Sequence, residues 1–156
     1  MPLCGRTFEG RMTEGTDPSD ASFGSQRLVM HVQSCTATEI RIPFDVGDDR
    51  SRTWVLTRTA DRLRLKHDHR HADGTPDEIT QYGGDAIEPL GELTIDFPAD
   101  AFTATMLPRA ATNIWTIGIE PGRAFTYALR REAEDRRFRV DFDLTRETSR
   151  MATPGS

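Results

Sequence analysis

Long apolar runs are missing from this 156-residue sequence, and none approaches the ~18 residues of a membrane-spanning helix. The opening stretch MPLCGRTFEGRM lacks the apolar centre of a signal peptide, so it gives no reason to expect export. Hydrophobic residues make up only 36% of the chain, but they fall in short alternating runs. We therefore expect a single domain over residues 1–147 and a flexible tail over 148–156, with disorder also in the Gly/Ser/Asp-rich stretch 13–25.

Lysine is almost absent, because Lys66 is the one lysine among 20 cationic residues and the others are arginines. With 25 acidic residues the net charge is -5. A general nucleic-acid binder needs a basic field that neutralises phosphates, so we do not expect that class of protein. Acidic residues are interleaved with the arginines throughout, which favours solvated strand faces over an anion-binding patch.

Cysteine is scarce, with Cys4 and Cys35 as the two examples. If CGRTFEGRM and RLVMHVQSC are antiparallel neighbours, a register that pairs Phe8 with His31 also places Cys4 opposite Cys35. Facing cysteines form a disulfide where their geometry and the compartment permit it. Two unrelated thiols are the alternative, and the sequence leaves both open. A disulfide would indicate an extracytoplasmic location.

Period-two alternation of apolar and polar residues is what the sequence has in abundance. It recurs in EIRIPFDV, LTIDF, IWTIGIE, FTYAL and RFRVDFDL. Strands with one dry and one wet face are typical of antiparallel sheets. Turn signals such as GDD, DGTP, YGGD and EPGR separate the runs. The pattern predicts an all-β fold with about ten short strands, either a lipocalin-like antiparallel barrel or a two-sheet sandwich, and at most one or two short helices, one within residues 98–107.

Three of the four histidines lie in LRLKHDHRH, at a spacing of two. His67, His69 and His71 have the same parity as Leu63 and Leu65, which mark the core face of the strand. The histidines therefore continue the inward face toward the DGTP turn, where they would line a barrel mouth or the rim between two sheets.

The segment after this turn, DEITQY, supplies a partner strand. A four-residue loop places His71 opposite Glu78, His69 opposite Thr80 and His67 opposite Tyr82. A one-residue slip would substitute Asp77, Ile79 and Gln81. The favoured ligand-binding set is His67, His69, His71, Glu78 and Tyr82. A plain polar hairpin, its histidines bonded to neighbours such as Asp68 or Asp73, is the alternative.

A His-x-His pair can converge on one ion, because residues two apart on a strand lie ~6.6–6.8 Å apart. His67 and His71 are ~13 Å apart at the backbone, too far to share a tetrahedral ion comfortably. A feasible site combines one His-x-His pair with Glu78, or with His31 from another strand. The candidate metal ligands are His67, His69 and Glu78, with a divalent transition metal as the cofactor. The pair is similar to that of cupins, but no glycine shortly precedes His67 and no histidine follows His71, so a cupin centre is not expected.

The block LKHDHRH.DG..D..T.YGGD, with FPAD, NIW and FRVDFDLTR after it, resembles a group of small uncharacterised bacterial proteins. The resemblance extends from about residue 27 to residue 146. No activity is assigned to that group, so the resemblance implies no catalytic residue. The glycine-x-tryptophan signature of a lipocalin's first strand is missing here.

Three functions stay open at this point. The favoured one is a module that binds a small polar or amphipathic ligand at the 63–82 hairpin. The second is a metal-dependent enzyme that uses a His-x-His pair with Glu78 and an open position for water. The third is a structural or interaction protein without a small-molecule site. The sequence identifies no catalytic residue, and the GxSxG motif of serine hydrolases is absent.

Overall fold

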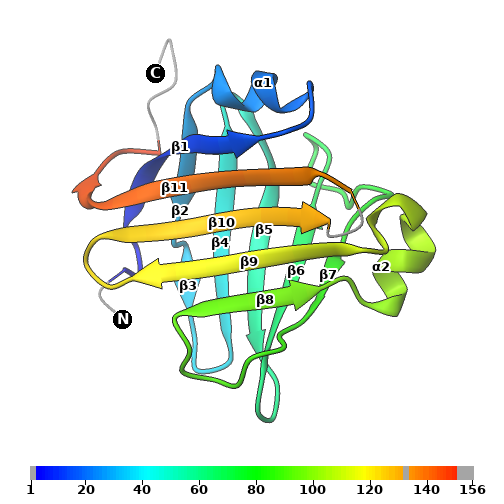
Figure 1. The fold of residues 1–156 in the computed structure, drawn as a ribbon. Helices are drawn as coiled ribbons and strands as arrows, with labels where there is room; N and C mark the ends of the chain where they lie inside the picture. The colour runs from blue at the N-terminus through cyan, green and yellow to red at the C-terminus, as the bar shows by residue number, and fades with distance from the viewer. Residues whose placement is uncertain (1–2, 132–133, 151–156) are drawn as a thin grey trace.

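Antiparallel strands form one eleven-stranded sheet that curls into a nearly closed barrel (Figure 1). The structure is a computed structural model and describes residues 3–131 and 134–150. In chain order the elements are β1 (Thr7–Gly15), α1 (Asp20–Gly24), β2 (Leu28–His31), β3 (Ser34–Cys35), β4 (Glu39–Val46), β5 (Asp49–Arg58), β6 (Leu63–His69), β7 (Tyr82–Asp85), β8 (Thr94–Pro98), α2 (Ala101–Met106), the 3-10 turn η1 (Pro108–Ala110), β9 (Asn113–Glu120), β10 (Ala124–Arg131) and β11 (Arg136–Glu147).

The strand order is β7-β6-β5-β4-β2-β1-β11-β10-β9-β8, with β3 pairing beside β4. In Figure 1 the front strands, β8 to β11 with β1, cross the rear strands at a steep angle. The predicted all-β barrel is confirmed. The predicted helix within residues 98–107 is α2, which begins where the Asp100 carboxylate accepts a hydrogen bond from the Thr103 amide.

The sheet's two edge strands, β7 and β8, meet along a seam. The Asp100 amide donates to the Gly83 carbonyl oxygen at 2.9 Å, and the Ile87 amide donates to the Asp96 carbonyl oxygen at 3.0 Å. The buried Thr103 hydroxyl donates to the same Gly83 oxygen and accepts from the Gly83 amide. These bonds satisfy backbone groups that an open sheet would leave unpaired.

Inward-facing residues of the predicted alternating runs form the core. Trp54 is fully buried and stacks on Phe44 and Tyr127, with ring centroids 4.8 and 4.4 Å away. Burial of each such side chain contributes ~1.5–3 kcal/mol. One position differs from the prediction, because β8 begins at Thr94 and Leu93, just before it, is 54% exposed.

Helix α1 covers one end of the barrel, in the stretch where we expected disorder. Its buried Asp20 carboxylate pairs with Arg136, with Oδ2 2.6 Å from Nη1. Phe23 packs edge-on against Phe138, and the Arg52 guanidinium lies 5.4 Å from the Phe23 ring centroid. Buried anchors of this kind explain why a polar, glycine-containing segment is ordered.

The predicted flexible tail begins with residues that contact the barrel. The Arg150 guanidinium lies 2.8 Å from the buried Asp45 carboxylate, and Arg27 donates to the Thr148 hydroxyl. Residues 151–156 lie outside the described part. Within the described residues, no helix is both long enough and apolar enough to cross a membrane.

Candidate functional site

The histidine strand β6 presents the two faces that its parity predicts. Leu65 and His67 are buried in the barrel, at 0% and 1% exposure, and His69 is half-buried. On the outer face Lys66 pairs with Asp100. The predicted partner of His67 is confirmed by the ladder pair His67–Tyr82. The predicted strand DEITQY is wrong, because residues 77–81 are not in a strand and the bridge between Arg70 and Pro76 has a different register. Side chains still bring the other predicted partners together, through the bond from the His69 amide to Thr80 Oγ1 at 2.7 Å and the contact between His71 Nε2 and Glu78 Oε1 at 3.2 Å.

Both ring nitrogens of His67 are used by the core. Nδ1 donates to the Tyr82 carbonyl oxygen at 3.0 Å, so Nε2 is the acceptor of the Tyr127 hydroxyl at 2.7 Å. The Tyr82 ring stacks on the imidazole at 4.4 Å. Burial lowers the pKa of His67 to about 4 and raises the pKa of Tyr127, so both groups stay neutral near pH 7.

These contacts argue against the predicted metal ligands His67, His69 and Glu78 as one set. His67 would lose two buried hydrogen bonds by binding an ion. Glu78 is exposed and contacts His71 instead. Parity showed that His67 points inward, but it did not show that Tyr82 and Tyr127 fill the space around it.

The buried His67 predicts an acid-dependent loss of stability. Below the ordinary imidazole pKa of 6.5 the unfolded chain binds a proton that the folded chain, with its pKa of about 4, does not. Stability is therefore complete above pH 6.5 and decreases as the pH falls toward 4. Nearby Arg52, Lys66 and His69 act in the same direction. We expect His67 to remove about 2 kcal/mol between about pH 7.5 and about pH 5.

Urea unfolding at both pH values, in chelator-treated buffer, measures this loss. His67→Gln is the matched control, because an amide does not titrate. Between the two pH values the free energy of unfolding of this variant should fall by about 2 kcal/mol less than that of wild type. Equal pH dependence in the two proteins would contradict the assignment.

At the end of β6 and just beyond it, four polar side chains gather at the hairpin tip: His69, His71, Asp77 and Glu78. Asp77 Oδ2 lies 3.3 Å from His69 Nδ1 and 3.8 Å from His71 Nδ1. We name these four residues the tip cluster. The sequence predicted that Asp77 would face the histidines only if the strand register slipped by one residue. In the structure it follows the DGTP turn directly, and its side chain reaches the histidines from there.

The opposite end of the barrel contains a cavity of about 180 Å³. Its walls come from strands all around the barrel and from the Cys4–Cys35 disulfide: Leu3, Cys4, Met30, Val32, Cys35, Ile40, Ile42, Leu56, Leu63, Glu92, Leu93, Ile95, Ile117, Ile119 and Phe125. Leu63 and His69 stand at opposite ends of β6, about 20 Å apart along the strand. The sequence prediction missed this cavity, although inward aliphatic residues at strand ends are its signature.

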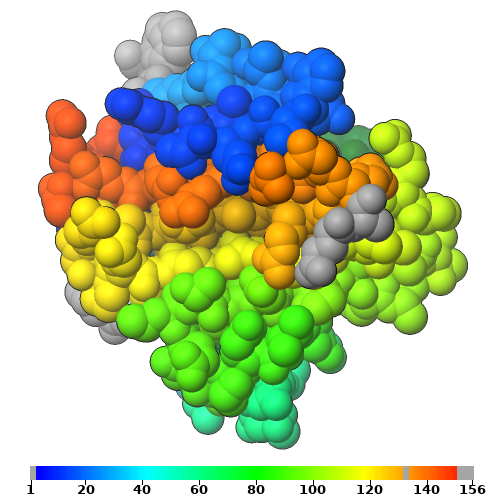
Figure 2. All heavy atoms as spheres, viewed as in Figure 1, coloured from blue at the N-terminus to red at the C-terminus, as the bar shows by residue number. Residues whose placement is uncertain are grey.

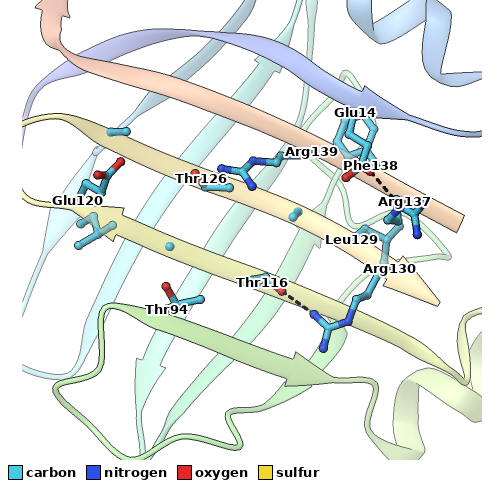
Figure 3. A pocket seen from close by; sticks show the side chains of 14 residues that line it. Glu14, Thr94, Thr116, Glu120, Thr126, Leu129, Arg130, Arg137, Phe138 and Arg139 are labelled. Carbon is cyan, nitrogen blue, oxygen red and sulfur yellow. Dashed lines mark hydrogen bonds and ion pairs between the residues drawn. The ribbon is translucent and has the colours of Figure 1, made fainter. Parts of the chain in front are cut away.

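A second hollow, of about 340 Å³, lies on the outer face over β9 to β11. Figure 2 shows this face, and Figure 3 shows Thr94, Thr116 and Thr126 on it, with Arg130 beside Thr116 and Arg139 beside Thr126. Its arginines are paired with carboxylates: Arg130 with Asp96, Arg137 with Glu14 and Arg139 with Asp141. These pairs neutralise the charge that an anionic ligand would need.

Comparisons of the chain with protein-family models, with curated proteins and with solved structures find no match. The functional argument therefore depends on the geometry of the two barrel ends.

Proposed function

We propose that the protein is a small-ligand-binding β-barrel that holds an apolar molecule, or the apolar end of a larger one. The ligand would occupy the 180 Å³ cavity beside the Cys4–Cys35 disulfide. The observation that carries the proposal is the chemistry of the lining. Among the described residues that line the cavity, Glu92 is the one charged side chain, and it is exposed.

The size and the apolar lining of the cavity support an apolar occupant. At the hairpin end, Trp54, His67 and Tyr127 fill the barrel, whereas aliphatic side chains at the other end leave space. A dry apolar cavity of about 150 Å³ holds a benzene-sized molecule. Each Å² of apolar ligand surface removed from water contributes ~25 cal/mol, so an aromatic ring or a short alkyl chain gains affinity without a polar partner.

This proposal keeps the ligand-binding interpretation of the sequence and moves the ligand to the other end of the barrel. The disulfide supports a site of action outside the cytoplasm, because such bonds persist in oxidising compartments. Cys4 and Cys35 themselves form part of the cavity wall. The covalent link therefore fixes the rim that the ligand contacts.

Calorimetric titration with benzene, indole, hexanoate and decanoate tests the proposal. Leu63 lines the cavity and is half-buried, so Leu63→Trp fills the space from the rim without overpacking the centre. We expect the variant to weaken binding at least tenfold, which corresponds to about 1.4 kcal/mol. Unchanged affinity in this variant would contradict the site.

Ile87→Trp is the matched control. Ile87 is 57% exposed and does not line the cavity, so the same increase in side-chain volume should leave affinity unchanged. A dissociation constant of about 1 mM corresponds to about 4 kcal/mol of binding free energy. If all four compounds bind wild-type protein more weakly than this, the proposal is wrong.

A further inference from the structure

We infer that the tip cluster, His69, His71, Asp77 and Glu78, is a binding site for a divalent transition metal of the zinc class. The site lies at the other end of the barrel from the proposed ligand cavity and does not depend on it. It differs from the ligand set predicted from the sequence, because Asp77 and His71 replace His67.

Two pairs of ligand atoms have the spacing that one ion requires, and His69 joins the group His71, Asp77 and Glu78 through its contact with Asp77. In a tetrahedral zinc site with bonds of about 2.0–2.1 Å, neighbouring ligand atoms lie about 3.3 Å apart. His71 Nε2 and Glu78 Oε1 are 3.2 Å apart, and His69 Nδ1 and Asp77 Oδ2 are 3.3 Å apart. One ligand atom each from His71, Asp77 and Glu78 can be chosen so that all three lie within 4.8 Å of one another.

Neighbouring groups orient two of the ligands from behind. The Ile79 amide donates to Asp77 Oδ1 at 2.9 Å, which leaves Oδ2 directed at the histidines. Ser51 Oγ lies 3.4 Å from His69 Nε2, which leaves Nδ1 for the ion. Outer contacts of this kind fix the ring orientation and tautomer of metal-binding histidines.

An unsatisfied atom supplies an independent observation. Among the described residues, His69 Nδ1 is buried and has no hydrogen-bond partner, although Asp77 Oδ2 is 3.3 Å away. The short distance without hydrogen-bond geometry leaves a buried nitrogen facing a carboxylate oxygen. A cation between the two would satisfy both, whereas a buried polar atom left alone costs about 1–3 kcal/mol.

Backbone bonds hold the loop that carries the cluster. The His71 amide donates to the Thr75 carbonyl oxygen, the Gly74 amide to the His71 oxygen, and the Asp77 amide to the His69 oxygen, all at 2.9 Å. His71 and Glu78 are exposed, so they can rotate to close the shell around an ion. Four protein ligands form a closed site, which is typical of structural zinc and leaves no position for a reactive water. The ion would stabilise the hairpin rather than catalyse a reaction.

The test uses untagged, chelator-treated full-length protein titrated with zinc chloride in a calorimeter. We expect one equivalent to bind with a dissociation constant in the micromolar range or tighter. His71→Gln and Asp77→Asn should each weaken binding at least tenfold. His31→Gln is the matched control, since His31 is bonded to Thr7 away from the hairpin, and it should bind zinc like wild type.

A second measurement keeps the proposal testable if a variant folds poorly. Cobalt added to wild-type protein should give the strong visible absorption of a tetrahedral site, and zinc should abolish it. No binding at about 100 µM zinc, equal affinity in folded His71→Gln and Asp77→Asn, or a weak octahedral cobalt spectrum would each overturn the inference.

Discussion

Replacing Gly84 with alanine is expected to lower the free energy of unfolding by about 4 kcal/mol or more. A Cβ at this position would overlap the Pro98 carbonyl oxygen on the other side of the seam. The neighbouring atom belongs to backbone, so no side-chain rotation relieves the overlap. The two edge strands must move apart, and the bonds between Gly83 and both Asp100 and Thr103 are then strained or lost.

Equilibrium unfolding in guanidinium chloride measures the effect. Gly118→Ala is the matched control, because Gly118 also lies in a strand but a Cβ there meets its nearest neighbour, Thr126 Cβ, at 3.7 Å, an ordinary contact. We expect that control to stay within about 1 kcal/mol of wild type. If Gly84→Ala were equally mild, β7 and β8 would not approach as closely as the structure places them.

The seam marks the boundary of what the sequence alone predicts. YGGD looked like a turn, because paired glycines usually mark one. In the structure it is strand β7, and its glycines are needed because Leu65 and Pro98 backbone atoms approach Gly83 and Gly84 closely. The requirement at Gly84 arises only because the first and last strands of the order meet, and no local sequence pattern records that meeting.

Strand positions and faces were predictable, because alternation is a local property. Phe44, Trp115, Val140 and Phe142 are buried on the predicted sides. The hairpin register was predictable at one pair, His67–Tyr82. Nearer the DGTP turn the prediction was wrong, because residues 77–81 form no strand and the bridge between Arg70 and Pro76 has a different register. The register of β1 with β2 was wrong by one residue, with Phe8 opposite Met30 and not His31, because a long, polar connection does not fix a register.

The candidate sites were only partly predictable for a physical reason. Parity gives the direction of a side chain, but the room left around it depends on residues from distant strands. His67 meets Tyr127, sixty residues away, and becomes core. Leu63, at the other end of the same strand, borders a cavity whose wall is formed by aliphatic residues from several distant strands.

Removing the Cys4–Cys35 disulfide by the double change Cys4→Ser and Cys35→Ser is expected to lower the free energy of unfolding by about 3–4 kcal/mol. The bond closes a loop across a sequence separation of 31 residues, and the loss follows from the entropy that the open loop returns to the unfolded chain. Cys4 precedes β1, and two backbone bonds would remain to hold this end of the chain: the Gly5 amide donates to the Val32 carbonyl oxygen at 2.7 Å, and the Val32 amide donates to the Arg6 carbonyl oxygen at 3.0 Å. Urea unfolding of the variant and of oxidised wild type gives the difference.

Reduced wild-type protein is the control that separates the bond from the side chains, and it should unfold at the same urea concentration as the double variant. The apolar cavity supplies a second readout, since both sulfur atoms belong to residues in its wall. Release of the rim should weaken binding of the apolar compounds, while zinc binding at the tip cluster, at the far end of β6, should not change. Equal stability of oxidised and reduced protein would mean that the rim is held by packing alone, and the case for an oxidising compartment would lose its support.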